Sequence, residues 1–140
     1  MKILIAADGS PYTRAAAQYV ARHTGLLKDP PEVRLIHVHA ALPVTRSISK
    51  KAIDEYYKEE SEKALAVAEE ELRKAGVPFT SKWTKGDAAE EIARYAKAEG
   101  IDLIVTGTRG HGALANLALG SVTNKLIALT KIPLLVIPQA

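Results

Sequence analysis

The chain lacks several features that would point directly to a class of protein. It has no cysteine, which excludes disulfide bonds, thiolate zinc sites and cysteine nucleophiles. It also has no apolar run near the roughly 20 residues that a membrane-spanning helix needs. The first apolar run, which follows Lys2, meets Asp8 too soon to form the core of a signal peptide. We therefore expect a cytoplasmic protein that does not insert into a membrane.

A strong excess of one charge is missing as well. The chain has 19 Lys and Arg against 16 Asp and Glu, which gives a net charge of +3. Without a dense basic stripe, this balance does not indicate a nucleic-acid partner, and a small anionic ligand is equally compatible with it. A length of 140 residues is typical of one domain with one core. We therefore expect a single domain over residues 1–140 and no binding of nucleic acid.

Short apolar segments alternate with longer segments of helical periodicity along the whole sequence. The expected strands are Lys2–Ala7, Val33–His39, Pro78–Trp83, Asp102–Gly107 and Leu134–Ile137. The expected helices are Tyr12–Gly25, Lys50–Ala75, Ala88–Gly100 and a last one from Ser121. This alternation predicts an α/β fold, with an open, mainly parallel five-stranded sheet and helices on both of its faces.

Open parallel sheets bind ligands beyond the carboxyl ends of their strands, where the winding of the chain reverses. Three segments of the sequence occupy such places. They are "ADGSP" after the first strand, "HVHA" after the second and "GTRGHGALANLALGS" after the fourth. If the first and fourth strands are neighbours, all three segments converge on one crevice.

The third segment has the composition of an anion site. Gly107, Gly110 and Gly120 allow positive φ angles and let a ligand approach the backbone N–H groups closely. The helix that follows offers unbonded N–H groups and a positive dipole end, beside the hydroxyls of Ser121 and Thr123. These features predict a site suited to phosphate. In the alternative interpretation the glycines only form a turn and Ser121 is an N-cap.

Two common phosphate-binding patterns do not account for this segment. The sequence contains no G-x-x-x-x-G-K-[ST], which excludes the Walker type of phosphate loop. Residues Gly110–Ala115 spell G-x-G-x-x-A, but they follow the fourth strand, and no acidic residue lies about 20 residues further on to hold a ribose. A dinucleotide-binding fingerprint is therefore rejected.

The spacing of Gly107, Gly110 and Gly120-Ser121 resembles the signature of the universal stress protein family, in its nucleotide-binding branch. The resemblance extends to "ILIAADGS" at the start, "IHVH" at the end of the second strand and "IPLLVIP" near the end, and so covers the whole domain. It implies a Rossmann-like sheet of the adenine nucleotide alpha hydrolase-like type. We expect the strand order 3-2-1-4-5.

The resemblance also implies ATP, or AMP or ADP, as the ligand. Asp8 matches the family's acid near the ribose and near a divalent metal, Mg²⁺ or Mn²⁺, bound to the phosphates. Ala7 and Val38 match positions whose backbone meets the nucleotide, with Val38 beside adenine. The matching positions of the phosphate and ribose loop are Gly107, Thr108, Arg109, Gly110, Gly120, Ser121, Val122 and Thr123. The chain departs from the family at Thr106, where a larger apolar residue is frequent, and Arg109 occupies a variable position.

The histidines invite other interpretations. His37 and His39 share one face of a strand, which a metal could use, but no third ligand is evident and buried histidines are more often packed and hydrogen-bonded. His111, in the glycine-rich segment, could contact a phosphate or simply be exposed. We assign no metal site to these residues.

The residues favour a binding protein over an enzyme. Asp8 is the one acid at the expected site, and phosphoryl transfer needs a positioned base and strong neutralisation of charge. We predict an ATP-binding regulatory stress-response protein, with slow hydrolysis at most and an unknown protein partner. A weak metal-dependent ATPase or phosphotransferase remains an alternative, as does a dimeric interaction protein that binds no nucleotide. The apolar strand Leu134–Ile137, expected at a sheet edge, predicts a homodimer, which the resemblance also implies.

Overall fold

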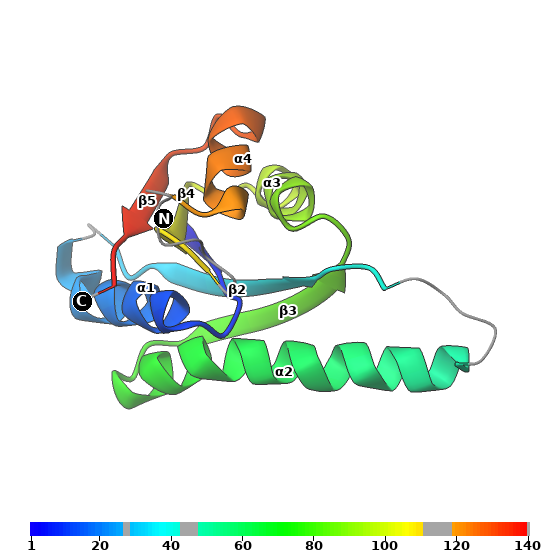
Figure 1. Cartoon of the computed structure of the whole chain (residues 1–140). Coiled ribbons are helices and arrows are strands. Elements are labelled where there is room, and N and C mark those ends of the chain that lie inside the picture. Colours follow the sequence, from blue (N-terminus) through cyan, green and yellow to red (C-terminus); the bar gives the residue numbers. More distant parts are fainter. Residues whose placement is uncertain (27–28, 43–47, 111–118, 140) are drawn as a thin grey trace.

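The computed structural model describes residues 1–26, 29–42, 48–110 and 119–139, and in them strands and helices alternate along the chain (Figure 1). The strands are β1 (Lys2–Ala6), β2 (Glu32–His39), β3 (Phe79–Lys85), β4 (Leu103–Gly107) and β5 (Leu134–Ile137). The helices are α1 (Pro11–Arg22), α2 (Lys50–Lys74), α3 (Ala88–Ala98) and α4 (Ser121–Leu129), with a short 3₁₀ turn at Thr24–Leu26.

The five strands form one parallel sheet with the order β3-β2-β1-β4-β5. This confirms the expected fold class and strand order. The central strand, β1, pairs on both sides, so that Ile5 lies between Leu35 of β2 and Val105 of β4. The winding reverses at β1, because β2 and β3 lie on one side of it and β4 and β5 lie on the other.

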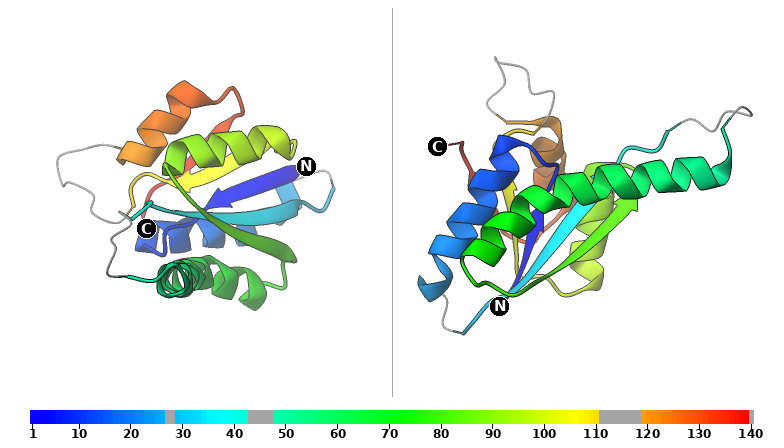
Figure 2. Two further views of the ribbon diagram at one scale, coloured as in Figure 1. Left: turned by 90° about the vertical axis from the view of Figure 1, so that its right-hand side faces the viewer. Right: turned by 90° about the horizontal axis from the view of Figure 1, so that it is seen from below.

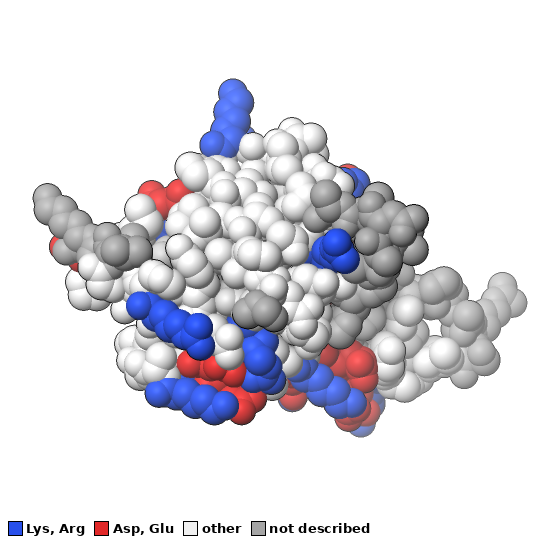
Figure 3. Space-filling model, turned by 60° about the vertical axis from the view of Figure 1, so that its left-hand side comes forward, with Lys and Arg blue, Asp and Glu red and all other residues white. Residues whose placement is uncertain are grey.

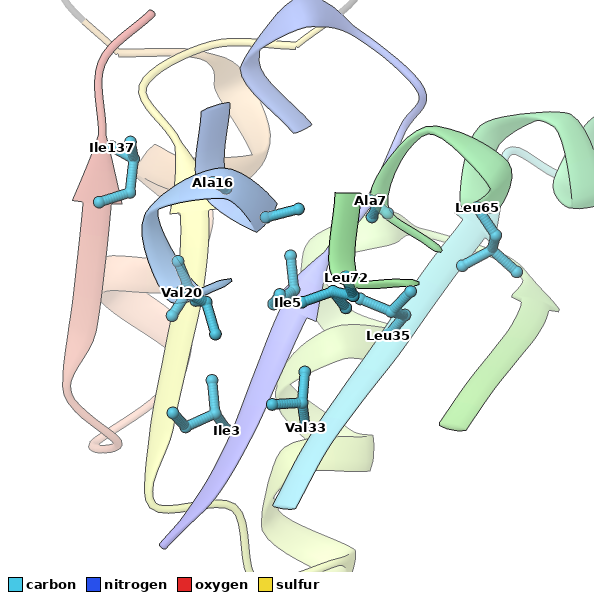
Figure 4. Close-up of a cluster of buried hydrophobic side chains, with 13 residues drawn as sticks. Ile3, Ile5, Ala7, Ala16, Val20, Val33, Leu35, Leu65, Leu72 and Ile137 are labelled. Atoms are coloured by element: carbon cyan, nitrogen blue, oxygen red, sulfur yellow. The ribbon is translucent and has the colours of Figure 1, made fainter. Parts of the chain in front are cut away.

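Helices cover both faces of the sheet. Figure 1 shows α1 and α2 on one face and α3 and α4 on the other. Side chains of β1 alternate between the two layers, because Ile3 and Ile5 pack toward α1 and α2 while Leu4 packs toward α3 and α4. Figure 4 shows Ile5, Leu35 and Leu72 gathered in the first of these layers. Burying each such side chain stabilises the fold by about 1.5–3 kcal/mol.

The longest helix, α2, ends in a glycine-based cap. Gly76 has a φ of +69° and its N–H donates to the carbonyl of Arg73 at 3.0 Å. The N–H of Val77 donates to the carbonyl of Leu72 at 2.9 Å, which completes a Schellman motif. At its other end, α2 extends beyond the sheet (Figure 2).

Element boundaries differ from the expectation by a few residues. β3 continues to Lys85 instead of ending at Trp83, because its backbone stays paired with β2 as far as His39. The helix α1 ends at Arg22, and the chain then forms the 3₁₀ turn within the segment that was expected to be helical. No helix among the described residues combines the length and the apolar character needed to cross a membrane.

Candidate functional site

A cavity of about 320 Å³ lies at the carboxyl ends of β1, β2 and β4. The segments that follow β1 and β4, the end of β2 and the first turns of α3 and α4 all contribute to it, so the three segments noted in the sequence do converge. Every residue expected at the site lines the cavity except Thr108. The lining residues from that expectation are Ala7, Asp8, Val38, Gly107, Arg109, Gly110, Gly120, Ser121, Val122 and Thr123.

Thr108 instead connects the surrounding elements through its backbone. Its N–H donates to the carbonyl of Ile137 at 3.0 Å, and its own carbonyl accepts from the N–H of Gly120 at 2.7 Å. These two bonds join the end of β4 to β5 and to the start of α4. The backbone of Thr108 therefore holds the cavity wall in place.

Asp8 is held by its own local structure. Its carboxylate Oδ1 accepts from the N–H of Ser10 at 2.9 Å and from the hydroxyl of Thr13 at 2.8 Å. The N–H of Asp8 donates to the same Thr13 hydroxyl at 2.9 Å. Because both donors to Oδ1 belong to the start of α1, the negative charge also lies near the positive end of that helix.

The N-terminus of α4 lacks the side-chain cap that α1 and α3 have. Its N-cap is Gly120, which has no side chain with which to cap the first turn. By contrast, Ser10 caps α1 by accepting from Thr13, and Asp87 caps α3 by accepting from Glu90. Ser121 is the first helical residue, so the alternative in which its side chain is an N-cap is wrong. The first turn of α4 thus faces the cavity with backbone N–H groups that need an acceptor.

The glycines at the site allow neighbouring segments of the chain to pack closely together. Gly107, Gly110 and Gly120 are not among the described glycines with a positive φ, so the freedom of glycine to take such an angle is not used there. A Cβ at Gly110 would lie 2.1 Å from Asp8 Oδ2, and a Cβ at Gly107 would lie 2.5 Å from the Cβ of Tyr12. Gly110 therefore lets the segment after β4 approach the carboxylate, and Gly107 lets β4 approach α1.

Two threonines of the cavity wall have structural hydrogen bonds. The hydroxyl of Thr123 is buried and donates to the carbonyl of Gly107 at 3.0 Å, which ties α4 to the end of β4. The hydroxyl of Thr106 donates to the same carbonyl at 3.4 Å. Thr106 thus places a small polar group in the cavity wall.

Several residues of the cavity wall were not predicted from the sequence. The apolar ones are Ala6 from β1, Ile36 from β2, Ala88 and Ile92 from α3, and Leu119 before α4. Ile36 could have been found from the strand period, because residues two apart on a strand share a face and Val38 was already assigned. Ala88 and Ile92 lie in no motif, and only the packing of α3 against the sheet brings them here. Thr13 was missed because its role depends on its hydrogen bonds to Asp8.

An ion pair links the two helices that flank the cavity. Lys125 of α4 contacts the carboxylate of Asp87 at 2.9 Å, at the start of α3. The ammonium of Lys125, together with the N–H of Glu90, lowers the pKa of Asp87 from its ordinary value of 3.8. The carboxylate in turn raises the pKa of Lys125. Both groups are well exposed, so the pair contributes little to stability at ordinary salt concentrations.

The two strand histidines are packed, as expected. His37 is buried, and its Nδ1 lies 2.7 Å from the carbonyl of Ala7. The rings of His37 and His39 meet edge to face with centroids 6.1 Å apart, and His39 also contacts the ring of Tyr57. Within the described parts of the chain, no three acidic or histidine side chains are grouped to hold a metal ion. His111 lies outside the described residues.

Comparison with known sequences places this chain in a family. A model of the universal stress protein family matches residues 1–138. Universal stress protein YxiE of Bacillus subtilis is 34% identical over 146 residues, which cover 97% of each chain. A universal stress protein of Thermus aquaticus is 37% identical over 136 residues, which cover 96% of each chain. The chain belongs to the universal stress protein family. The resemblance seen in the glycine spacing is thereby confirmed.

Solved structures share the fold. Protein MJ0577 of Methanocaldococcus jannaschii superposes with a TM-score of 0.80 at 28% identity, over 99% of this chain and 96% of that one. A universal stress protein in complex with cAMP has a TM-score of 0.73 at 17% identity, over 100% and 98% of the two chains. The universal stress protein of Archaeoglobus fulgidus in complex with dAMP has a TM-score of 0.66 at 21% identity, over 98% and 97%.

Proposed function

We propose that this universal stress protein binds an adenine nucleotide, with ATP as the regulatory ligand and AMP or ADP as related ones. The observation that carries the proposal is the composition of one cavity. Its lining includes the apolar side chains of Ile36, Val38 and Ile92, together with the first turn of α4. An apolar wall with a few polar groups suits a flat base, and a helix N-terminus suits phosphate.

The phosphates are assigned to the start of α4. The N–H groups of Ser121 and Val122 belong to a first turn whose N-cap is glycine, and both residues line the cavity. The positive end of the helix dipole favours an anion at this place. Arg109 lines the same cavity, and its guanidinium adds a charged donor for phosphate oxygens.

The carboxylate of Asp8 fits a different part of the nucleotide. A carboxylate accepts hydrogen bonds and repels phosphate, so it can hold a sugar hydroxyl directly. It can also hold Mg²⁺ or Mn²⁺ together with phosphate oxygens, because Mg²⁺ is commonly bound through one or two carboxylates plus substrate phosphates. Such an ion would neutralise phosphate charge. We assign the metal, when present, to Asp8 and the ligand.

Relatives in the structural comparison support an adenine nucleotide. Two universal stress proteins of the same fold were solved with cAMP and with dAMP. Both ligands contain adenine and a phosphate group. The cavity of this chain offers an apolar wall and a helix N-terminus to these two parts.

We further propose that the protein acts by binding and hydrolyses ATP slowly at most. Asp8 is the one carboxylate among the described residues of the cavity, and its Oδ1 already accepts two hydrogen bonds from α1. A general base for phosphoryl transfer must be placed to take a proton from the nucleophile. A regulatory role, in which a partner protein recognises the nucleotide-bound state, fits this arrangement best.

Three measurements on the purified protein test this function. Mass spectrometry of the ligand released on denaturation should find an adenine nucleotide, and calorimetric titration with ATP should show saturable binding. A turnover assay at saturating ATP should find only slow hydrolysis. Fast turnover would favour the ATPase, whereas no bound ligand and no binding of ATP, ADP or AMP would favour the interaction protein that binds no nucleotide.

The metal has a test of its own. If Asp8 holds Mg²⁺ against the phosphates, Asp8→Asn should weaken ATP binding more in Mg²⁺ than in chelator, because only the first condition contains the ion that the carboxylate holds. Calorimetric titration of both proteins under both conditions measures this. Equal weakening in Mg²⁺ and in chelator would assign Asp8 to the sugar alone.

We propose that the chain forms a homodimer through β5. This strand lies at the edge of the sheet, and Leu134, Leu135 and Val136 remain partly exposed on it. Figure 3, which looks at the molecule from the side of β5, shows a broad area without charged side chains, bordered by charged ones. An apolar sheet edge tends to pair with another chain.

Light scattering tests the dimer. The wild type should have about twice the 15.1 kDa of one chain. Val136→Lys should shift the mass toward the monomer, because a charged side chain on an edge strand opposes pairing. Val136 is not among the side chains packed into either core, so the fold should persist. A wild-type monomer at micromolar concentration would contradict the proposal.

A further inference from the structure

Thr106 places a hydroxyl on the apolar side of the cavity. It belongs to β4, is 6% exposed and lines the cavity. Thr106 lies two residues after Ile104, so the two side chains share the face of the sheet that α3 and α4 cover. Ile36 and Ile92, which also line the cavity, pack in the same layer. The hydroxyl of Thr106 therefore lies on the side of the cavity that carries its apolar wall.

A small residue leaves space next to this hydroxyl. Ala6 of β1 pairs in register with Ile36 of β2. On the other side of β1, the pairing of Ile5 with Val105 brings the next residues, Ala6 and Thr106, side by side, because the two strands are parallel. Ala6 lines the cavity and packs in the same layer as Ile36. Only a methyl group thus stands between the side chains of Ile36 and Thr106, which leaves a slot with one apolar side and one side that bears a hydroxyl.

The hydrogen bond that Thr106 makes within the protein is long. Its hydroxyl donates to the carbonyl of Gly107 at 3.4 Å, whereas O–H···O bonds are typically about 2.5–3.0 Å long. The same carbonyl accepts from the Thr123 hydroxyl at 3.0 Å, so it keeps a partner when Thr106 turns away. A hydroxyl can donate one hydrogen bond and accept others. A buried hydroxyl with a poor partner gains free energy when a ligand supplies a better one.

We propose that Thr106 is a specificity-determining residue whose hydroxyl forms a hydrogen bond with a polar atom on the edge of the nucleotide base. The inference rests on the proposed function, which assigns the apolar wall to the base. Apolar contacts hold a flat ring but discriminate weakly between rings that differ in one polar atom. The buried hydroxyl adds this discrimination, because a base without the matching atom leaves the hydroxyl with its poor partner.

The test combines variants of Thr106 with analogues of ATP that each lack one polar group of adenine. Wild type, Thr106→Val and Thr106→Ser are titrated by calorimetry with ATP, with its 1-deaza, 3-deaza and 7-deaza analogues, and with purine riboside triphosphate, which lacks the 6-amino group. Thr106→Val should bind ATP about fivefold more weakly than wild type, because valine has a similar shape without the hydroxyl. Thr106→Ser should bind ATP within about twofold of wild type, because serine keeps the hydroxyl. The analogue that lacks the atom bound by Thr106 should bind equally to wild type and to Thr106→Val.

A control variant is available at Thr130. Its hydroxyl accepts from the N–H of Ile132 at 3.1 Å, outside the cavity, so Thr130→Val also removes a threonine hydroxyl and should bind ATP as wild type does. Thermal unfolding of all variants provides the folding control.

The analogues distinguish a contact with the base from an effect on the protein alone. A loss of affinity in Thr106→Val that has the same size for ATP and for every analogue would overturn the inference, because the hydroxyl would then act only through the carbonyl of Gly107. Binding of ATP to folded Thr106→Val within about twofold of wild type, or equal losses in Thr106→Val and Thr106→Ser, would also overturn it while leaving nucleotide binding intact. Failure of wild type to bind ATP would overturn the proposed function together with the inference.

Discussion

Two helices begin at the same edge of the sheet, and their first turns differ. In α1 the N-cap Ser10 accepts from the N–H of Thr13, and the Thr13 hydroxyl and the Ser10 N–H both bind Asp8. In α4 the N-cap is Gly120, and its N–H donates to the carbonyl of Thr108. Side chains of the protein itself thus satisfy the start of α1, while the N-cap of α4 supplies none.

The difference between the two first turns indicates that the start of α1 contributes to stability and the start of α4 to ligand recognition. A serine N-cap stabilises a helix by about 1 kcal/mol relative to alanine, while glycine is a few tenths of a kcal/mol worse than serine. A helix start without a capping side chain therefore costs little and leaves backbone N–H groups for a ligand. In this account α1 holds Asp8 in a fixed position, and α4 binds the phosphates. The two helix starts should accordingly respond differently to substitution.

The largest effect is expected where the two regions meet, at Gly110. Gly110→Ala adds a Cβ 2.1 Å from Asp8 Oδ2, so the carboxylate or the segment after β4 must move. ATP affinity should fall at least about tenfold, which corresponds to about 1.4 kcal/mol. Calorimetric titration measures it. Gly25→Ala is the matched control, because nothing lies within 4 Å of its added Cβ and Gly25 has no positive φ.

Unchanged ATP affinity in a folded Gly110→Ala protein would show that Asp8 does not belong to the ligand site. Thermal unfolding of both alanine variants provides the folding control. A loss of affinity in Gly25→Ala of the same size would show that the effect comes from the fold and not from the cavity.

A capping side chain on α4 should weaken binding next most strongly. In Gly120→Asp, the carboxylate would accept from the first-turn N–H groups and repel the phosphates, so the start of α4 would come to resemble that of α1. Gly120→Ala carries the same Cβ, which lies 3.2 Å from Arg109 Cα, without the charge. Titration should show that Gly120→Asp binds ATP about fivefold more weakly than Gly120→Ala. Equal ATP affinities of Gly120→Asp and Gly120→Ala would show that the start of α4 does not bind the phosphates.

The corresponding change in α1 should affect stability more than binding. Ser10→Ala removes the N-cap acceptor but keeps the N–H that binds Asp8, because that group belongs to the backbone. The free energy of unfolding should fall by about 1 kcal/mol. Denaturant unfolding measures this loss, and titration should find ATP affinity within about threefold of wild type. A loss of ATP affinity larger than in Gly120→Asp would reverse the assignment of the two helix starts.

The smallest effect concerns α3, whose start lies at the same edge. Its N-cap Asp87 has a lowered pKa, so the charged carboxylate adds stability that is fully present above the ordinary value of 3.8 and is lost as the pH falls through the lowered value. Asp87→Asn keeps a capping oxygen without the charge. The difference in unfolding free energy between wild type and Asp87→Asn should therefore be small at pH 7 and shrink at about pH 3. A difference that grows on acidification would contradict the lowered pKa.

The sequence was sufficient to predict the sheet but not the contacts at its edge. Alternation of apolar strands and helices restricts the chain to a parallel sheet, and the spacing of Gly107, Gly110 and Gly120 indicated the family. The reason for these glycines could not be read from the sequence, because the approach of Gly110 to Asp8 depends on how two distant segments pack. The place of Ile92 in the cavity wall could not be predicted for the same reason, because α3 joins the cavity only through the tertiary fold.

The central claim is that an adenine nucleotide binds in this cavity with its phosphates at the start of α4. An amide NMR titration of the isotope-labelled protein with ATP measures both the affinity and the place. The account predicts saturable shifts at Gly110, Ser121, Val122 and Ile92, with little change in the part of α2 that extends beyond the sheet. Absence of saturable shifts, or shifts confined to residues outside the cavity, would contradict it.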